Sequence, residues 1–297
     1  MTSSLVMAGR ALELPPGQPL LMGVVNASPE SFSDGAQVGD LEAQVARAEG
    51  LVADGASILD IGGESGVTDK PAVAAQEEIE RVCPLIERVS AMGVTVSVDT
   101  WKPEVARAAI GAGASLVNDV SALLDPGLAD VCAQTGAGLV ITHTRAEPKR
   151  KEFPSYEDVT ADVLELLGDR LALALERGVG EGSIVLDPGP DLAKTPAQTI
   201  DVLSHLDQVV ALGHPVLLAV SRKDFVGALT QRRPADRLSG TLAAVGEGVD
   251  AGAAILRVHD VAQVSDFLRV RAALRGQAGV PPDLALDPSL RRQRAAE

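Results

Sequence analysis

The chain has few aromatic residues and few histidines. Its 297 residues include four Phe, one Trp, one Tyr and four His, whereas hydrophobic residues of all types make up 46%. The core must therefore consist mainly of Ala, Val, Leu and Ile, the residues that fill parallel sheets and the helices packed on them. This composition favours an α/β protein, and the length suits a single (β/α)8 barrel, which occupies about 250 residues.

Positive charge and cysteine are also scarce. The 26 Lys and Arg residues are outnumbered by 41 Asp and Glu residues, which gives a formal net charge of −15. Nucleic acids and anionic membranes bind basic surfaces, so we expect no nucleic-acid partner and no membrane partner.

Cys83 and Cys132 lie far apart and are expected to be plain thiols. Since there is no apolar stretch of about 18 residues and no signal peptide, we expect a cytoplasmic protein.

A unit recurs along the chain: a helix-like stretch, a turn, a short apolar run and then a polar residue. Copies of the turn and run occur at residues 54–60, 113–118, 136–143, 182–187, 214–221 and 252–257, and two further runs are Leu20–Val25 and Val94–Val98. Most of the turns contain glycine, which after a helix adopts the left-handed conformation that lets the chain reverse. Continuous apolar runs of this kind are typical of parallel strands that are buried on both faces.

Eight such strands predict a closed (β/α)8 barrel, because closure leaves no strand edge unpaired. The alternative is an open doubly wound sheet, but no G-x-G-x-x-G turn follows the first strand. We expect one barrel domain at residues 20–275, with an N-terminal extension at 1–19 and a C-terminal tail at 276–297. The helices are expected at residues 41–53, 76–91, 103–111, 127–135, 156–177, 197–212, 236–250 and 262–274.

A polar residue ends nearly every predicted strand, where the interior of a packed barrel would have Val, Ile or Leu. Any one of these residues could simply cap the next helix. Because the C-terminal ends of all the strands meet on one face of a barrel, the whole set instead predicts a binding site there. Its members are Asn26, Asp60, Asp99, Asn118, His143, Asp187, Ser221, Lys223, Arg257 and His259.

The chemistry of this set indicates an anionic heterocycle as ligand. Carboxylates and amides beside a lysine can form paired hydrogen bonds with the edge of a flat, nitrogen-rich ring. The last two strands are followed by basic residues, where barrels of this type bind phosphate: Arg222, Lys223, Arg257 and His259. With so few histidines a metal held by the protein is less expected, whereas Mg²⁺ that arrives on a diphosphate needs few protein ligands.

Short segments resemble those of the dihydropteroate synthase family over nearly the whole chain, from about Leu20 to Arg275. Each segment is short, but their order and spacing together are specific. They are Met22 to Gly35 (MGVVNASPESFSDG), Asp60 to Ser65 (DIGGES), Ser97 to Thr100 (SVDT), Asn118 with Asp119, Leu186 to Gly189 (LDPG), Ser221 to Lys223 (SRK), Arg237 with Leu238, Gly240 to Ala244 (GTLAA) and Arg257 to Val261 (RVHDV).

The resemblance implies a transferase of folate biosynthesis. In such enzymes 4-aminobenzoate displaces diphosphate from 6-hydroxymethyl-7,8-dihydropterin diphosphate to give 7,8-dihydropteroate. The resemblance also implies Mg²⁺ as cofactor, bound mainly through the substrate diphosphate and otherwise through Asn26. It further implies a homodimer that pairs through its last helices, which in this chain include residues 262–274.

The resemblance also assigns the site residues, in three groups. The pterin would be bound by Asp99, Asn118, Asp187 and Lys223. The diphosphate would be bound by Asn26, Arg257 and His259, and the catalytic residues would be Asp99, Lys223 and Arg257. The aminobenzoate pocket would consist of Phe32, Ser65, Leu192, Ser221 and Arg222.

Several residues depart from the family pattern, most of them on the aminobenzoate side. Val67 stands where the family has an arginine, Leu192 where it has an aromatic residue, and Asp191 adds a negative charge. Ala219 replaces a glycine beside the pterin. Two alternatives to a synthase follow: a divergent paralogue that binds pterin diphosphate without making dihydropteroate, and a folate-dependent methyl carrier. The Ser-Phe-Ser-Asp and Ser-Arg-Lys segments fit the carrier poorly.

Overall fold

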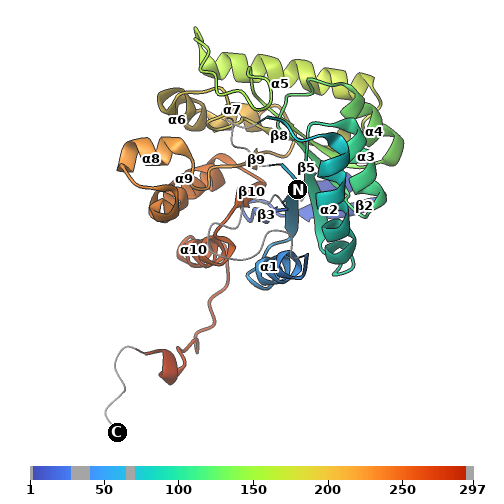
Figure 1. Ribbon diagram of the computed structural model, residues 1–297. Helices are drawn as coiled ribbons and strands as arrows, with labels where there is room; N and C mark the ends of the chain where they lie inside the picture. The colour runs from blue at the N-terminus through green and yellow to red at the C-terminus, as the bar shows by residue number, and fades with distance from the viewer. Residues whose placement is uncertain (1–2, 28–40, 65–70, 292–297) are drawn as a thin grey trace.

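The main element of the fold is a parallel sheet of eight strands, seen in a computed structural model that describes residues 3–27, 41–64 and 71–291. The strand order is β8-β7-β6-β5-β4-β3-β10-β9. A parallel bridge between Leu186 in β8 and Val216, next to β9, joins the two ends of this order and closes the barrel (Figure 1). The predicted (β/α)8 barrel is therefore confirmed. Its strands are β3 (Leu20–Asn26), β4 (Ile58–Gly62), β5 (Thr95–Asp99), β6 (Leu116–Asp119), β7 (Gly138–Thr142), β8 (Ile184–Asp187), β9 (Leu217–Leu218) and β10 (Ile255–Val258).

Helices surround the barrel (Figure 1). Most lie close to the predicted positions, but the helix expected at 197–212 is broken at His205, which ends α6 and precedes α7. The sequence pattern does not predict the short helix α8 (Asp224–Thr230) between β9 and α9. The other helices are α1 (Leu41–Ala53), α2 (Ala75–Ser90), α3 (Pro103–Gly111), α4 (Gly127–Thr135), α5 (Val159–Glu176), α6 (Pro196–Ser204), α7 (Leu206–Val210), α9 (Leu238–Ala251) and α10 (Val261–Leu274).

Side-chain caps determine where two of these helices begin. The Asp158 carboxylate accepts a hydrogen bond from the backbone N–H of Ala161 (2.9 Å), so α5 begins at Val159 and not at the predicted residue 156. Before α6, Thr195 and Gln198 form a capping box, with Thr195 N–H donating to Gln198 Oε1 (2.7 Å). Both helices follow long loops on the C-terminal face, so these caps determine where the loops end.

A hairpin that the sequence pattern does not predict covers the N-terminal end of the barrel. Its strands, β1 (Ser3–Met7) and β2 (Arg10–Leu14), pair antiparallel around a two-residue turn. Leu5, Met7 and Leu14 are buried in one cluster with the inward-facing side chains of the barrel strands. The hairpin therefore closes the end of the barrel opposite to the predicted site.

A second layer of buried side chains lies between the strands and the helices. Gly23 in β3 shows how tightly this layer packs, because a Cβ at that position would lie 3.2 Å from Leu51 Cδ1 and 3.3 Å from Val261 Cγ2. A side chain there would require Leu51 or Val261 to shift.

After α10 the chain leaves the barrel, and residues 276–291 extend away from it (Figure 1). The domain boundaries at residues 20 and 275 stay a prediction. Within the described ranges, no helix is long and apolar enough to cross a membrane.

Candidate active site

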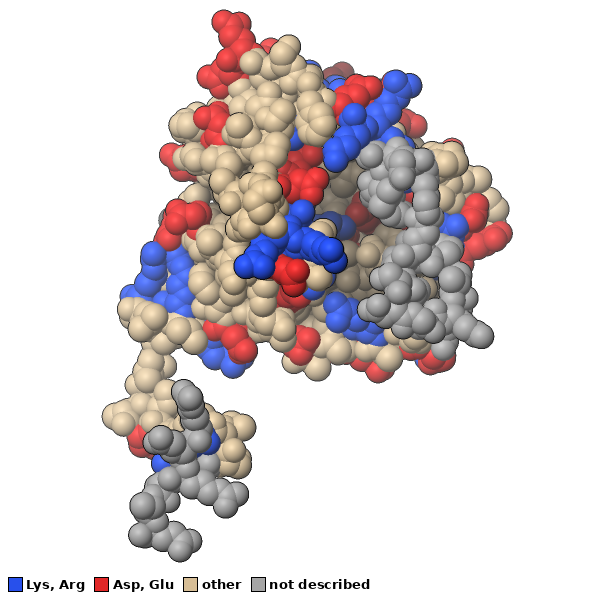
Figure 2. Space-filling model, turned by 60° about the vertical axis from the view of Figure 1, so that its left-hand side comes forward, with Lys and Arg blue, Asp and Glu red and all other residues tan. Residues whose placement is uncertain are grey.

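A cavity of about 480 Å³ lies at the C-terminal ends of the strands, a volume in the range of small-molecule sites. Asp99, Asn118 and Asp187 reach it from the ends of β5, β6 and β8, and Arg257 reaches it from β10. Figure 2 shows a hollowed face of the molecule with Lys and Arg side chains beside the hollow. The long loops after β7 and β8 contribute residues 146–153 and 189–193 to the lining.

Arg257 lies at the centre of the polar network. Its Nε donates to Asp60 Oδ2 (2.6 Å) and its Nη2 donates to Asp99 Oδ2 (2.7 Å). Asp60 Oδ2 also accepts from Asn118 Nδ2 (3.0 Å). The network thus joins side chains of β4, β5, β6 and β10 across the barrel interior. Asp60 is fully buried, so the guanidinium supplies the positive charge that a buried carboxylate requires.

Burial in this network changes the acidity of its members. It raises the pKa of Asp99 to about 7; Arg257 opposes this rise, while the nearby Asp60 carboxylate adds to it. For Arg257 burial acts to lower the pKa, but Asp60 and Asp99 outweigh it and raise the pKa. The site therefore contains a permanently charged guanidinium beside a carboxyl group that titrates near neutral pH.

Three buried polar atoms in this region have no hydrogen-bond partner among the described residues. They are Asn118 Oδ1, Asp60 Oδ1 and Ser97 Oγ. An unsatisfied buried acceptor costs about 1–3 kcal/mol, so such atoms are uncommon unless a ligand or an ordered water completes them. Since Asn118 lines the cavity, its carbonyl oxygen can accept an N–H from a bound ring.

Asp187 and Lys223 complete the group to which the resemblance assigns the pterin. Asp187 is 4% exposed, and its Oδ1 accepts from Gly189 N–H (2.7 Å). Burial raises the pKa of Asp187, against the effect of this hydrogen bond. Lys223 lines the cavity immediately before α8, and burial lowers the pKa of its ammonium group. The structure brings Asp99, Asn118, Asp187 and Lys223 together around one cavity, as the sequence analysis expects; their roles stay predictions.

Other predicted site residues lie outside the described lining of the cavity. Arg222, with a positive φ of 59°, forms a bidentate ion pair with Asp260. Ser221 is buried, and its Oγ lies 3.0 Å from His259 Nδ1. Asn26 ends β3 with an exposed side chain. The structure does not bring these four predicted residues, Ser221, Arg222, His259 and Asn26, to the cavity surface, and their roles in binding stay predictions.

The departures from the family pattern, together with the matching pocket residues Phe32 and Ser65, divide into two groups. Leu192 and Ala219 line the cavity, so substitutions at these positions change its surface directly. Phe32, Ser65 and Val67 lie outside the described residues.

The Asp191 carboxylate forms hydrogen bonds that the sequence does not predict. Its Oδ2 accepts from the backbone N–H groups of Asp224 and Phe225 at the start of α8, the second at 3.3 Å. Its Oδ1 lies 3.1 Å from the Thr199 hydroxyl, which donates to it. The carboxylate therefore caps α8 from another loop, and helix N-terminal N–H groups compensate much of its charge.

Sequence reasoning about the site missed the basic loop after β7. Lys149, Arg150 and Lys151 all line the cavity, together with the aromatic residues Trp101 and Phe153. Lys151 Nζ lies 5.9 Å from the centre of the Phe153 ring. A run of three basic residues in a chain with a net charge of −15 is the signal that could have identified this loop as part of the cavity lining.

Lys102 binds two buried carboxylates beside the cavity. Its Nζ donates to Glu64 Oε2 (2.8 Å), to Glu78 Oε2 (2.6 Å) and to the Val73 carbonyl (2.6 Å). The side chains of Glu64 and Glu78 are almost fully buried, at 2% and 0% exposure. Because Glu64 also lines the cavity, this ammonium connects the site to α2.

Replacing Lys102 by Met is expected to lower the free energy of unfolding by about 1.5–3 kcal/mol, since it leaves a buried carboxylate without its charged partner. Urea denaturation followed by circular dichroism measures this. Arg88→Met is the matched control, because the Arg88 pair with Glu42 is solvent-exposed, and its effect should be much smaller. Equal effects of the two substitutions would show that the buried cluster contributes no more to stability than an exposed ion pair.

Comparison with known proteins agrees with this geometry. A family model described as "Pterin binding enzyme" matches residues 22–259. The dihydropteroate synthase of Bacillus subtilis (strain 168) is 41% identical over 88% of this chain and 90% of its own length. The Xanthomonas albilineans dihydropteroate synthase solved with 4-aminobenzoic acid has a TM-score of 0.86 at 41% identity, and covers 95% of this chain and 100% of its own. The same enzyme in complex with 7,8-dihydropteroate has a TM-score of 0.83 at 42% identity, over 94% and 100% of the two chains.

The fold and the site define a (β/α)8-barrel enzyme whose C-terminal cavity has carboxylates, an amide and cations for a small polar ligand. The chain belongs to the family of pterin-binding enzymes.

Proposed function

We propose that this protein is a dihydropteroate synthase. It joins 6-hydroxymethyl-7,8-dihydropterin diphosphate to 4-aminobenzoate, with 7,8-dihydropteroate and diphosphate as products. The observation that carries the proposal is the cavity itself, where Asp99, Asn118 and Asp187 present acceptors beside Lys223 and Arg257. Relatives that match this chain over nine-tenths of its length and have been solved with 4-aminobenzoic acid or 7,8-dihydropteroate support the same conclusion.

Asp99, Asn118, Asp187 and Lys223 would bind the pterin. The ring N–H and amino groups are donors, and the two carboxylates together with Asn118 Oδ1 are the acceptors that fit them. Asn118 Oδ1 has no partner among the described residues, so a ring donor would remove an existing cost of burial. Lys223 would donate to an acceptor on the ring, which gives it a hydrogen bond in the cavity.

In the reaction, the amino nitrogen of 4-aminobenzoate forms a bond to the pterin methylene carbon. The bond from that carbon to the diphosphate oxygen breaks, diphosphate leaves with the electron pair, and the nitrogen loses a proton. Arg257 would stabilise the negative charge that develops on the leaving oxygen, together with Asn26 and His259. The protein thus contributes positioning and electrostatic stabilisation, without a covalent intermediate on the chain.

We also propose Mg²⁺ as cofactor. Among the described residues, no group of three His, Cys, Asp or Glu side chains is placed to hold a metal ion. This donor set fits a cation held mainly by the substrate diphosphate, with the Asn26 side-chain oxygen as its protein ligand. When bound, Mg²⁺ would supply positive charge to the leaving group.

The divergent paralogue is the second candidate, and Leu192 is the observation that favours it. Leu192 lines the cavity where the family has an aromatic residue. Asp191 supports the paralogue less than its charge alone suggests. Its carboxylate accepts hydrogen bonds at the start of α8.

One experiment separates the two candidates: release of diphosphate from the pterin diphosphate, measured with and without 4-aminobenzoate. A synthase releases diphosphate only when 4-aminobenzoate is present and forms dihydropteroate in equal amount. Pterin binding by calorimetry without turnover would instead identify the non-catalytic paralogue.

The affinity for the pterin should rise about tenfold between pH 6 and pH 8, because a carboxyl with a pKa near 7 becomes ionised over this range. The sign follows from Asp99: burial raises its pKa to about 7, and only the ionised form accepts two ring donors. Burial raises the pKa of Asp187 as well, which acts in the same direction. Calorimetric titration at several pH values measures the effect. In Asp99→Asn the pterin affinity should change less with pH. A wild-type affinity that falls as pH rises would contradict the proposed roles of Asp99 and Asp187.

We propose a homodimer and a cytoplasmic location on the basis of the resemblance. Val270 and Leu274 on α10 support the dimer, since they are 59% and 83% exposed and apolar. Sedimentation velocity of the purified protein measures its oligomeric state.

A further inference from the structure

Lys194 is a lysine side chain in the protein interior for which the proposed reaction has no use. It is 1% exposed and is the largest of the fully buried side chains among the described residues. Burying an ammonium group is costly unless several acceptors surround it. Lys194 lies at the end of the loop that connects β8 to α6, so the hydrogen bonds of its buried side chain affect the conformation of that loop.

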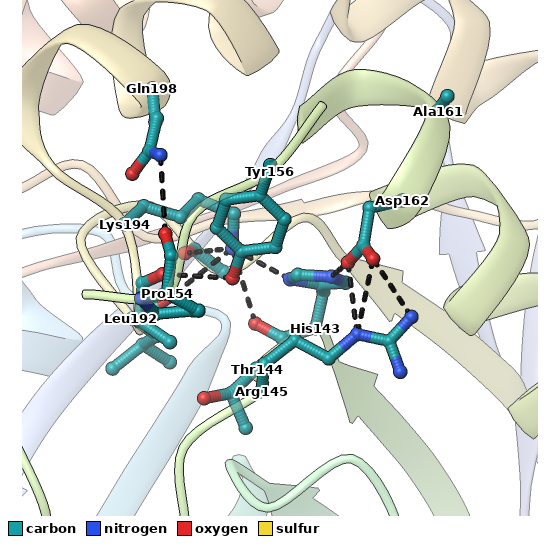
Figure 3. A network of polar contacts seen from close by, with 12 residues as sticks. His143, Thr144, Arg145, Pro154, Tyr156, Ala161, Asp162, Leu192, Lys194 and Gln198 are labelled. Carbon is teal, nitrogen blue, oxygen red and sulfur yellow. Dashed lines mark hydrogen bonds and ion pairs between the residues drawn. The ribbon is translucent and has the colours of Figure 1, made fainter. Parts of the chain in front are cut away.

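The contacts of Lys194 tie this loop to the end of β7. Its Nζ lies 2.7 Å from His143 Nδ1, 3.0 Å from the Gly189 carbonyl and 3.1 Å from the Leu192 carbonyl (Figure 3). An ammonium group has three N–H donors, and these three acceptors can use all of them. Two acceptors belong to the backbone of the loop itself and the third to the residue after β7. One side chain therefore closes the loop on itself and attaches it to the barrel.

His143 is itself held in one orientation. It is fully buried, and its Nε2 lies 2.9 Å from Asp162 Oδ1 on α5. Burial lowers the pKa of His143 to about 4, and the neighbouring Lys194 adds to this effect. The neutral ring accepts from Lys194 at Nδ1, so Nε2 carries the proton and donates to Asp162. Arg145 binds the same carboxylate from the other side (Figure 3).

The ammonium form of Lys194 predominates below neutral pH. Burial lowers the pKa of Lys194 to about 7, and the carboxylates of Asp187 and Asp162 oppose this effect. Measurements at pH 6.5 therefore observe mainly the charged side chain.

The loop needs such an anchor because its backbone is strained. Asp191 and Ala193 have φ angles of +64° and +51°, in the left-handed region that residues other than glycine adopt at a cost. Conformations of this kind persist only where the surroundings hold them. A second anchor is Tyr156, whose hydroxyl donates to the Ala193 carbonyl (2.8 Å).

The loop presents one side to the cavity and the other to Lys194. Pro190, Asp191 and Leu192 line the cavity, whereas Lys194 does not. We propose that Lys194, oriented by His143, is a positioning residue that holds this loop in the shape that forms the aminobenzoate side of the site. This inference rests on the proposed synthase function and specifies how one side of its site is built.

Steady-state kinetics of Lys194→Met at pH 6.5 tests the proposal. Met keeps the length of the side chain and removes its donors. The KM for 4-aminobenzoate is expected to rise about tenfold or more, which corresponds to the loss of about 1.4 kcal/mol. The affinity for the pterin diphosphate should change by less than about threefold, because ladder hydrogen bonds of β8 also hold Asp187. Arg271→Met, which removes a half-buried cation on α10, is the matched control and should change neither value.

Tyr156→Phe provides a second variant in case Lys194→Met does not fold. It removes a single hydrogen bond to the same loop and should raise the KM for 4-aminobenzoate in the same direction by a smaller factor. Equal changes in the constants for both substrates, or no change in either, would overturn the proposal.

A readout without turnover distinguishes failure of the inference from failure of the proposed function. Amide hydrogen exchange at residues 189, 191 and 192 should become faster in Lys194→Met and in Tyr156→Phe, while exchange in α3 stays unchanged. If the wild-type protein forms no dihydropteroate, the proposed function fails, but faster loop exchange still supports the anchor. Unchanged loop exchange in both variants overturns the inference, whether or not the enzyme turns over.

Discussion

Replacing Arg257 by Met is expected to reduce the rate of dihydropteroate formation at least about 100-fold, the effect of removing a group that stabilises developing charge. The same change leaves the buried Asp60 carboxylate without its ion-pair partner. The free energy of unfolding should therefore fall by about 3–5 kcal/mol. Steady-state kinetics and urea denaturation measure the two effects separately.

A double variant separates the two roles of Arg257. Adding Asp60→Asn to Arg257→Met removes the buried charge, so much of the lost stability should return. Turnover should stay low, because the cation proposed to stabilise the leaving diphosphate is still absent. Arg275→Met, which breaks an exposed pair with Asp250, controls for loss of an arginine in general. Recovery of turnover in the double variant would mean that Arg257 acts only on the fold.

Replacing Lys223 by Met should weaken pterin binding by about 10- to 100-fold, the loss expected for one hydrogen bond to a charged group. The Lys223 ammonium lies among Asp191, Asp187 and Asp99, which favour its charged form against the effect of burial. Met would remove the donor and leave the carboxylates around the ring less compensated. Calorimetric titration with the pterin diphosphate measures the change.

Lys151→Met is the control for Lys223→Met. Lys151 also lines the cavity, but its side chain is 61% exposed and its ion pair with Asp224 is long, at 3.7 Å. Its removal should change pterin affinity less than about threefold, as is usual for exposed charges. If the two substitutions weaken binding equally, the net positive charge of the cavity, and not the position of Lys223, determines affinity.

The barrel was predictable because its strands are continuous apolar runs, each followed by a polar residue at the same end. Those polar residues identify the face of the site before any geometry is known. The sequence could not give the pairing within the site: Arg257 and Asp60 are separated by 197 positions, and only the closed barrel brings them together.

The hairpin at the N-terminus had a signal that the prediction did not use. Ala8 and Gly9 both have positive φ angles, and they form the two-residue turn typical of β-hairpins. The alternation of Leu5 with Met7 and of Leu12 with Leu14 fits two short strands with one buried face. The pattern of the barrel strands does not extend to these two, because the barrel strands are continuous apolar runs whereas the hairpin strands bury only alternate side chains.

Lys194 and Asp191 mark the limit of what residue types can indicate. A lysine or an aspartate in a loop is expected at the surface, because burial of either charge is costly. Both are held by backbone groups, which carry no sequence signal: Lys194 by carbonyls of its own loop, and Asp191 by N–H groups at α8. Such partners become visible only when the fold places them.

The contact between Asp191 and α8 has a thermodynamic consequence. Asp191 lies in the loop beside Leu192, and α8 begins directly after Lys223. The Asp191 carboxylate therefore connects the proposed aminobenzoate side of the site to the proposed pterin side. In the proposed function, a pterin bound by Lys223 would also restrict the loop that forms the aminobenzoate side of the site. Part of the ordering entropy of the second binding event would then be lost in the first, and by reciprocity each substrate would increase the affinity for the other by the same factor.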